Sequence, residues 1–393
     1  MGEPYLTSKL QGFGTTIFAE MSALAVATKA INLGQGFPDT DGPDEVRQAA
    51  LDAIAEGRGN QYPPGLGIPE LRAAVVAHQQ RWYGVELDPE REVLVTCGAT
   101  EAIAAALLAL LDTGDEAIAF EPYYDSYAAC ISMAGAGRRP VTLRAPDFAL
   151  DVDALRAAVT PRTRLILLNS PHNPSGKVFD RDELTAIAEV AQEHDLLVVA
   201  DEVYEHLTFD DAVHVPISTL PGMAERTVTI GSAGKSFSFT GWKVGWATGP
   251  VPLVAAVRAA KQFLTYVASG PFQYAAAVGL ALPDQYFADV REDLQRKRDR
   301  LADGLERVGL EVFRPQGTYF ISVDIRSVGE EDGMAFCRSL PERCGVVAVP
   351  NVVFYDDVEA GRPLVRFAFC KRMSVLEEAV ERLAGLGVGG GRS

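Results

Sequence analysis

The stretch TVTIGSAGKSFSFTGWKVGW, residues 227–246, decides how this chain folds and what chemistry it carries. Its first four residues, Thr227–Ile230, form a largely β-branched run that predicts a buried strand. A loop of small residues then presents Lys235 between Gly234 and Ser236. Lysine is seldom buried unless its charge is used or removed, and a desolvated amine has a lowered pKa and can form a Schiff base. The loop therefore indicates chemistry, with a solvated surface lysine as the alternative.

The same stretch also resembles the end of a nucleotide-binding P-loop, whose pattern is G-x-x-x-x-G-K-[ST]. The first glycine of that pattern would fall at position 229, which is Thr229. The acidic strand end that could hold magnesium, LLVVAD at residues 196–201, precedes the loop instead of following it. A P-loop nucleotide hydrolase is therefore a remote alternative.

The composition is that of an ordinary globular protein with room for two domains. The chain has 393 residues, of which 48% are hydrophobic and 23% charged. A formal net charge of −17 argues against nucleic acid or an anionic membrane as partner, because both need basic surfaces. The longest apolar run, residues 102–111, is too short to span a bilayer, and the first residues do not read as a signal peptide.

The positions of the cysteines and histidines indicate the cellular compartment and whether a metal site is expected. The five cysteines are scattered without a C-x-x-C pair, which predicts a reducing, cytoplasmic location. The five histidines show no ligand-like spacing with the cysteines, so no metal site is expected.

From Glu92 onward, apolar β-rich runs alternate with helical patterns. The expected strands are Val93–Cys97, Ala117–Phe120, Val141–Arg144, Leu165–Leu168, Leu196–Ala200 and Thr227–Ile230. The expected helices among them are Thr100–Leu111, Tyr124–Ala134, Asp151–Ala158 and Asp180–His194. Such alternation predicts an α/β fold with a mainly parallel sheet between two helical layers. Because Val244–Thr248 follows the strand before it through a short loop without a helix, this seventh strand should be antiparallel.

The rest of the chain predicts a second, smaller α+β unit. Helices are expected at Ile17–Lys29, Asp44–Glu56, Pro69–Tyr83 and Val251–Val267, and strands at LEVFRPQGTYFISVDI, VVAVP and LVRFAFC. We place a domain boundary near Asp284. The expected division is an N-terminal arm, 1–45, packing with the small domain, a large domain, 46–284, a small C-terminal domain, 285–386, and a flexible tail, 387–393.

Polar side chains follow the carboxyl ends of the expected strands, where open parallel sheets bind ligands. They are Gly98, Ala99 and Thr100 in GATEA, Tyr124 in EPYYDSY, Asn169 and Asn173 in NSPHNPSG, Asp201 and Tyr204 in DEVY, and Ser232 with Lys235. Taken singly, each could be a helix cap or a turn residue. Together they match pyridoxal phosphate, which needs a lysine, a carboxylate for its pyridine nitrogen, donors to its phenolic oxygen and an anion site.

A long series of motifs along the chain resembles the motifs of a known protein family. NLGQGFPD, NQYPPG, GATEAI, EPYYDSY, NSPHNPSG, DEVYEHL, SAGKSFSFTGWKVGW and LVRFAFCKR occur in this order. With them the chain resembles the class I aminotransferases of the fold-type I pyridoxal phosphate enzymes, from about Leu6 to Leu386. It is most similar to the branch that holds kynurenine and glutamine transaminases and actinobacterial N-succinyldiaminopimelate aminotransferases. The resemblance implies a three-layer αβα large domain, a smaller α+β domain and a homodimer.

The resemblance also implies roles at matching positions. Lys235 would hold the cofactor as a Schiff base and move the proton at the substrate α-carbon, and Asp201 would keep the pyridine nitrogen protonated. Asn173 and Tyr204 would donate to the phenolic oxygen. The other implied cofactor contacts are the Tyr124 ring and a phosphate site of Gly98, Ala99, Thr100, Ser232, Lys243 and Tyr62, the last from the other subunit.

For the substrate, the resemblance implies that Arg366 grips the α-carboxylate in a bidentate fork, flanked by Gly36 and Asn173. At two positions this sequence differs from some of its relatives. Lys243 stands where aspartate aminotransferases have an arginine, and Ser269 stands where kynurenine and glutamine transaminases tend to have an aromatic–histidine pair. The small residue favours the succinyldiaminopimelate type.

The expected activity is therefore a ping-pong transamination between glutamate and a 2-keto acid, in lysine biosynthesis. A kynurenine or glutamine aminotransferase and a cysteine-conjugate β-lyase are alternatives with the same cofactor. A non-catalytic regulator is a further alternative, but such proteins carry a basic DNA-binding extension, which this sequence lacks, and here the lysine is present.

Overall fold

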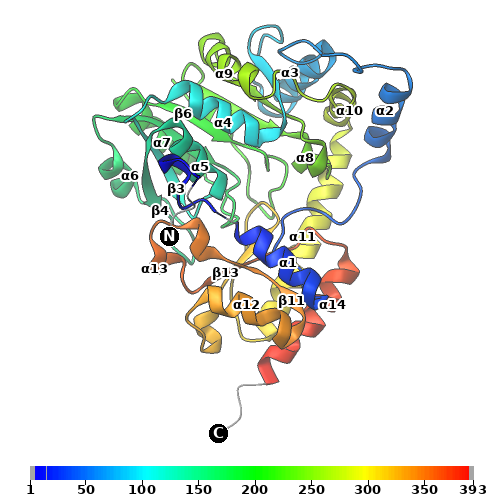
Figure 1. Cartoon of the computed structure of the whole chain (residues 1–393), viewed down its shortest axis with the longest axis vertical. Helices are drawn as coiled ribbons and strands as arrows, with labels where there is room; N and C mark the ends of the chain where they lie inside the picture. The colour runs from blue at the N-terminus through cyan, green and yellow to red at the C-terminus, as the bar shows by residue number, and fades with distance from the viewer. Residues whose placement is uncertain (1–4, 15, 389–393) are drawn as a thin grey trace.

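A seven-stranded sheet forms the centre of the larger, upper part of the computed structural model (Figure 1), which describes residues 5–14 and 16–388. In spatial order its strands are β2 (Val93–Thr96), β8 (Gly245–Thr248), β7 (Thr227–Ser232), β6 (Leu197–Asp201), β5 (Thr163–Asn169), β3 (Glu116–Glu121) and β4 (Gly137–Thr142). β8 is antiparallel to both neighbours and all other pairs are parallel. The predicted α/β fold, its seven strands and the antiparallel seventh strand are confirmed.

The alternation of side chains across the strands explains the layers. Along β3, Ala117 and Ala119 pack with the helices on one face, whereas Ile118 and Phe120 pack into the core on the other. Every residue of β2, β3, β7 and β8 is buried, as expected for strands covered on both faces.

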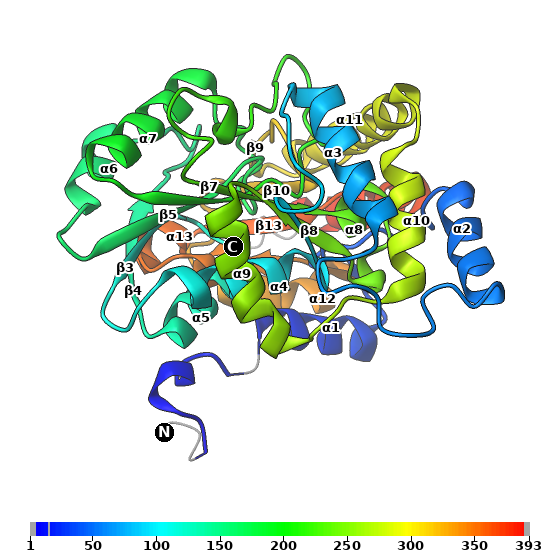
Figure 2. The ribbon, with the colours of Figure 1, turned by 90° about the horizontal axis from the view of Figure 1, so that it is seen from above.

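Three groups of helices surround this sheet. One face carries α4 (Gly98–Leu110), α5 (Asp125–Ala134) and α9 (Val251–Leu264), and the other carries α6 (Val152–Ala158) and α7 (Arg181–Glu193). The remaining group, α2 (Asp44–Ala55), α3 (Pro69–Tyr83) and α10 (Gly270–Leu280), packs together at the end of the sheet that holds β2 (Figure 2). The short helix α8 (Ala233–Ser236) follows β7 directly.

The predicted strand Val141–Arg144 is wrong in its bounds, because β4 covers Gly137–Thr142. β4 lies at the edge of the sheet, and of its residues only Val141 is buried, so its polar first residues show no apolar pattern. Pairing with β3 sets its position, and an edge strand tolerates Pro140. VVAVP, predicted as one strand, forms two, β11 (Val346–Val347) and β12 (Val349–Pro350), which pair with different partners.

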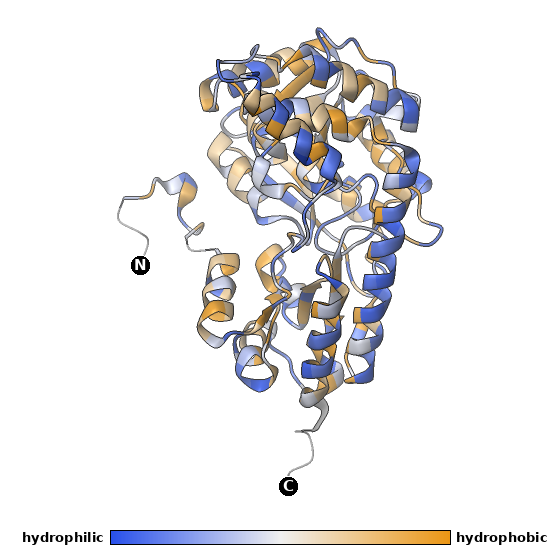
Figure 3. Cartoon of the chain, turned by 90° about the vertical axis from the view of Figure 1, so that its right-hand side faces the viewer, coloured by the Kyte–Doolittle hydropathy of each residue, from blue (hydrophilic) through white to orange (hydrophobic). Residues whose placement is uncertain are grey.

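The smaller, lower part is built on a four-stranded antiparallel sheet. Its strands, in spatial order, are β12, β13 (Leu364–Ala368), β10 (Phe320–Asp324) and β9 (Glu311–Phe313). Its helices are α11 (Asp284–Arg307), α12 (Gly333–Cys344), α13 (Val358–Gly361) and α14 (Met373–Leu383). The long helix at the right of Figure 3, α11, is mostly hydrophilic, whereas the strands it covers are hydrophobic.

The N-terminal segment lies against this smaller part. β1 (Ile31–Asn32) pairs in parallel with β11, and Glu20 of α1 (Ile17–Thr28) forms an ion pair with Arg338 of α12. The proposed boundary residue, Asp284, is the first residue of α11. Of the tail predicted to be flexible, residues 389–393 lie outside the described residues. Among the described residues, no helix combines the length and the apolar character needed to cross a membrane.

Close backbone packing joins β8 to the start of α4, and this contact yields a stability prediction. A Cβ atom at Gly245 would lie 2.7 Å from the Gly98 carbonyl carbon and 2.8 Å from the Ala99 nitrogen. Gly245→Ala should therefore lower the free energy of unfolding by roughly 1–3 kcal/mol, measured by urea denaturation. The control is Gly241→Ala, because a Cβ there meets no atom within 4 Å. Equal stability of the two variants would contradict the prediction.

Candidate active site

A cavity of about 280 Å³ opens at the carboxyl ends of β5, β6 and β7, facing the smaller sheet. The parallel register places Asn169 beside Asp201, and Asp201 beside Ile230 of β7. The sequence-predicted residues that line the cavity are Gly36, Gly98, Ala99, Thr100, Tyr124, Asn169, Asn173, Asp201, Tyr204, Ser232, Lys235, Lys243 and Arg366. Segments far apart in the sequence therefore meet at one cavity.

Lys235 extends into this cavity from α8. Its Nζ donates to the Tyr319 hydroxyl at 2.8 Å, and that hydroxyl donates to the Gly36 carbonyl at 2.7 Å. The partner of the Lys235 amine is thus a neutral hydroxyl, and burial lowers the pKa of the amine to about 8 although the attraction of Cys370 and Asp201 opposes the shift. About a tenth of the amine is therefore neutral at pH 7, and about half at pH 8. The P-loop alternative is wrong, because α8 ends at Ser236 and no phosphate-binding helix follows the lysine.

Asp201 is a buried carboxylate at the end of β6. Its Oδ2 accepts a hydrogen bond from the Tyr127 hydroxyl at 2.5 Å, and its Oδ1 accepts one from the Val203 N–H at 3.4 Å. Burial raises the pKa of this carboxyl to about 6, while the Tyr127 hydroxyl opposes the shift. A cation bound beside Asp201 would keep it ionised, so the site suits a protonated ring nitrogen.

The start of α4 forms an anion site. The first N–H groups of a helix lack partners within the helix and attract negative charge. Glu101 turns away from the cavity here: its carboxylate accepts from the Cys97 N–H at 2.6 Å. Lys243 Nζ lies 3.4 Å from the Thr100 hydroxyl, and a Cβ at Gly98 would come within 3.2 Å of that Nζ. Backbone donors and one cation therefore converge here, with Ser232 on the same cavity wall.

Arg366 enters the cavity from β13 of the smaller sheet and is 2% exposed. Its two terminal nitrogens donate to Asn173 Oδ1 and to the Gly34 carbonyl, each at 3.1 Å. Burial lowers the pKa of this guanidinium to about 10. Its Nε has no partner, and no carboxylate pairs with it among the described residues. A buried, unpaired guanidinium suits a carboxylate ligand.

Asn169 links the ends of β5 and β6. Its amide donates to the Asp201 carbonyl at 2.8 Å, and its Oδ1 accepts from the Asn173 N–H at 2.7 Å. The Tyr204 ring lies edge-on to Tyr319, with centroids 5.3 Å apart. These contacts hold the backbone of Asn173 and the ring of Tyr204 at the cavity.

Sequence reasoning missed several residues at this site. Tyr319 holds Lys235, and Tyr127 holds Asp201. Phe320 lies 4.0 Å from the Arg366 guanidinium, measured to the ring centroid. Tyr127 follows Tyr124 by one helical turn in EPYYDSY, a spacing that could have revealed it, but Tyr319 lies in a loop without such a pattern. Tyr62 does not line the cavity; it is 81% exposed and contacts Tyr266.

The residues present fit pyridoxal phosphate. The cavity joins a primary amine without a counter-ion, a buried carboxylate whose ionisation needs a cation, and backbone donors at a helix start. These three features match the aldehyde, the ring nitrogen and the phosphate of that cofactor in turn. The Arg366 guanidinium, whose Nε has no hydrogen-bond partner, offers a separate site for the carboxylate of a substrate.

Comparison with known proteins agrees with the fit of these residues to pyridoxal phosphate. The family model described as Aminotransferase class I and II matches residues 28–383. A probable N-succinyldiaminopimelate aminotransferase of Mycobacterium tuberculosis is 54% identical over 388 residues, covering 96% of this chain and 97% of its own. The solved structure of the N-succinyldiaminopimelate aminotransferase from that organism has a TM-score of 0.95, with 97% and 100% of the two chains covered.

Two further relatives are more distant. Methionine aminotransferase of Escherichia coli is 40% identical, with 96% of this chain and 97% of the relative covered. Kynurenine–oxoglutarate transaminase of Dictyostelium discoideum is 38% identical, with 96% and 95% covered. The similarity therefore extends over nearly the whole of each chain.

The lowered pKa of Lys235 can be measured by its reactivity in cofactor-free protein. Because the neutral amine is the nucleophile, acylation of Lys235 by acetic anhydride should increase with pH around a midpoint near 8. Peptide mass spectrometry gives the extent at each pH. A lysine peptide in the same tube, with an ordinary pKa of about 10.4, is the reference. A Lys235 midpoint equal to that of the peptide would contradict the desolvation argument.

Proposed function

Because the chain belongs to the class I and II aminotransferases, which work with pyridoxal 5′-phosphate, we propose that it is an N-succinyldiaminopimelate aminotransferase. In the biosynthetic direction it would pass the amino group of glutamate to N-succinyl-2-amino-6-ketopimelate, a step of lysine biosynthesis. The observation that carries this proposal is the end-to-end similarity to the mycobacterial relative of that activity. The exchange is ping-pong: glutamate leaves as 2-oxoglutarate before the keto acid enters.

The cofactor, when bound, supplies an electron-withdrawing ring that stabilises negative charge at the substrate α-carbon. We assign its carbonyl carbon to Lys235, its ring nitrogen to Asp201 and its phenolic oxygen to Asn173 and Tyr204. Its ring is assigned to the face of Tyr124. The assigned phosphate contacts are Gly98, Ala99, Thr100, Ser232 and Lys243. Of these groups, the Lys235 amine has the chemistry to carry a proton to and from the substrate α-carbon, because its lowered pKa gives both protonation states near pH 8.

Arg366 is assigned to the substrate α-carboxylate, beside Gly36 and Asn173. Its guanidinium is already held by Asn173 and the Gly34 carbonyl, so little side-chain entropy would be lost on binding. Both substrates of a transaminase carry an α-carboxylate, and one residue can therefore serve both half-reactions.

We also propose a homodimer in a reducing cytoplasm. Tyr62, Phe263 and Tyr266 are large apolar side chains with exposed fractions of 81%, 85% and 55%, and Tyr62 contacts Tyr266. An apolar surface of this kind favours burial against a second copy. Ser269, the residue before α10, follows Tyr266 by three positions and would then lie in the same region. All five cysteines are free thiols, as the proposed compartment requires.

A panel of amino donors with 2-oxoglutarate as acceptor tests the proposed substrate. N-succinyl-L,L-diaminopimelate should give a kcat/KM at least roughly tenfold above those of kynurenine, glutamine and methionine, measured by glutamate formation. Lys235→Ala should show no turnover and serves as the blank. A higher kcat/KM with kynurenine or glutamine would reject the substrate assignment. Faster release of pyruvate from a cysteine conjugate would favour the β-lyase alternative.

The role assigned to Arg366 predicts a shared defect. Arg366→Lys keeps the charge and loses the bidentate fork, so kcat/KM should fall roughly 10- to 100-fold for glutamate and for the succinylated substrate alike. The control is Arg362→Lys, because Arg362 is exposed and four positions away. A fall in kcat/KM for only one of the two substrates would indicate that Arg366 binds the side chain of that substrate and not the α-carboxylate.

A further inference from the structure

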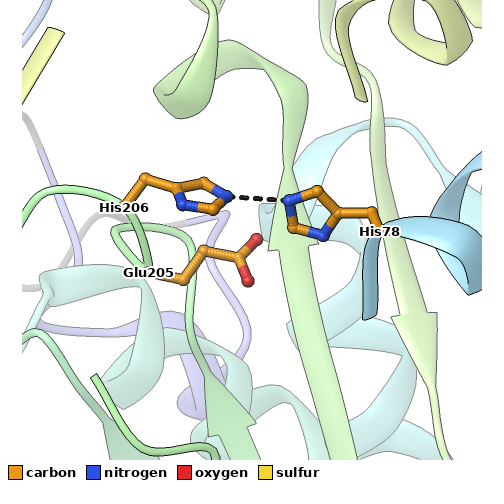
Figure 4. Close-up of side chains that lie close together, drawn as sticks. All are labelled: His78, Glu205 and His206. Carbon is orange, nitrogen blue, oxygen red and sulfur yellow. Dashed lines mark hydrogen bonds between the residues drawn. The ribbon is translucent and has the colours of Figure 1, made fainter. Parts of the chain in front are cut away.

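Three titratable side chains that do not line the active-site cavity form a cluster of their own (Figure 4). His78 belongs to α3, and Glu205 with His206 follows β6 in the DEVYEHL motif; one donor atom from each lies within 4.8 Å of the other two. The two imidazoles meet through their Nε2 atoms at 2.7 Å, and the Glu205 carboxylate lies beside this pair. Asp201 and Tyr204 of the same motif line the cavity, so the motif presents its side chains to two separate sites.

Two polar atoms of this cluster are buried without a partner. Glu205 is 5% exposed, and its Oε2 accepts no hydrogen bond. His78 is 2% exposed, and its Nδ1 is likewise unpartnered. A buried carboxylate oxygen without a donor is costly, so the cluster calls for a cation or a proton at this position.

We propose that His78, Glu205 and His206 form a zinc-binding site. Two imidazole nitrogens and one carboxylate oxygen are a donor set that Zn²⁺ takes in tetrahedral sites with one open position. A cavity of about 340 Å³, lined by Glu205, His206 and His214 among others, borders the cluster. It gives a metal ion a route in and a water molecule room to be the fourth ligand.

The charged side chains close to the cluster have partners of their own. Arg81 pairs with Asp284, and Glu202 lies 3.2 Å from His214.

The geometry needs a small adjustment. Two nitrogens on one tetrahedral Zn²⁺ stand roughly 3.3 Å apart, about half an ångström more than the observed separation. His206 is half-buried at the edge of the cavity, where its ring packs against Phe287 and Trp82, so the adjustment would take place within this aromatic contact. The expectation of no metal site considered spacing with cysteines, whereas here the fold joins histidines 128 positions apart. A bound ion would tie α3 to the loop that follows β6 and carries Tyr204.

The test uses the holoenzyme after dialysis against a chelator. Zn²⁺ should bind at one equivalent per chain by elemental analysis and should raise the Tm. Co²⁺ in its place should give the visible d–d absorption of a four-coordinate site with nitrogen ligands. His78→Gln and Glu205→Gln should each weaken Zn²⁺ binding by roughly 100-fold or more. The matched control is His194→Gln, because His194 is exposed and should leave binding unchanged.

Each outcome decides the proposal. Stoichiometric binding that is lost in both cluster variants and kept in the control supports it. Absence of stoichiometric Zn²⁺ in the folded wild-type holoenzyme overturns it, whatever the stability of the variants. Full binding by His78→Gln or Glu205→Gln also overturns it and assigns the metal to other ligands. In either of those cases the short imidazole contact is a proton bridge.

Discussion

The desolvation of two cations between the two sheets is the constraint on which this structure depends. Lys235 and Arg366 both lie in the cavity between β7 and β13, and among the described residues neither forms an ion pair. Burying an unpaired charge is costly, and both groups respond with a lowered pKa. The surrounding hydroxyls and carbonyls hold the cations in place without neutralising them. Each cation is therefore left open to a ligand: a carbonyl carbon suits the amine and a carboxylate suits the guanidinium.

The parallel sheet makes this arrangement possible. Its strands bring their carboxyl ends to one edge, and each end supplies one group of different chemistry. Asp201 and Asn169 are adjacent in register because β5 and β6 are parallel neighbours. Arg366 comes from the other sheet, and Gly34 and Gly36 come from the N-terminal segment. The site is thus complete only when three distant segments pack together.

The sequence predicted the fold and most cavity residues because both follow local patterns. Strand ends carry polar residues, and apolar runs mark buried strands, so Asp201, Asn173 and Lys235 could be placed before the structure was known. β4 was misplaced because its position depends on pairing at an edge. Tyr319 was missed because its contact with Lys235 spans 84 positions, and the His78–His206 pair spans 128. Contacts of that kind come from tertiary packing and leave no spacing to detect.

Reduction of the holoenzyme with borohydride tests the central claim most directly. If the Lys235 amine is the covalent anchor of pyridoxal phosphate, reduction should fix the cofactor on a single tryptic peptide, and fragment masses should place it on residue 235. The Lys235→Ala protein should carry no label under the same treatment. A label fixed on another lysine of the native enzyme, or none at all in yellow, freshly prepared protein, would contradict the account.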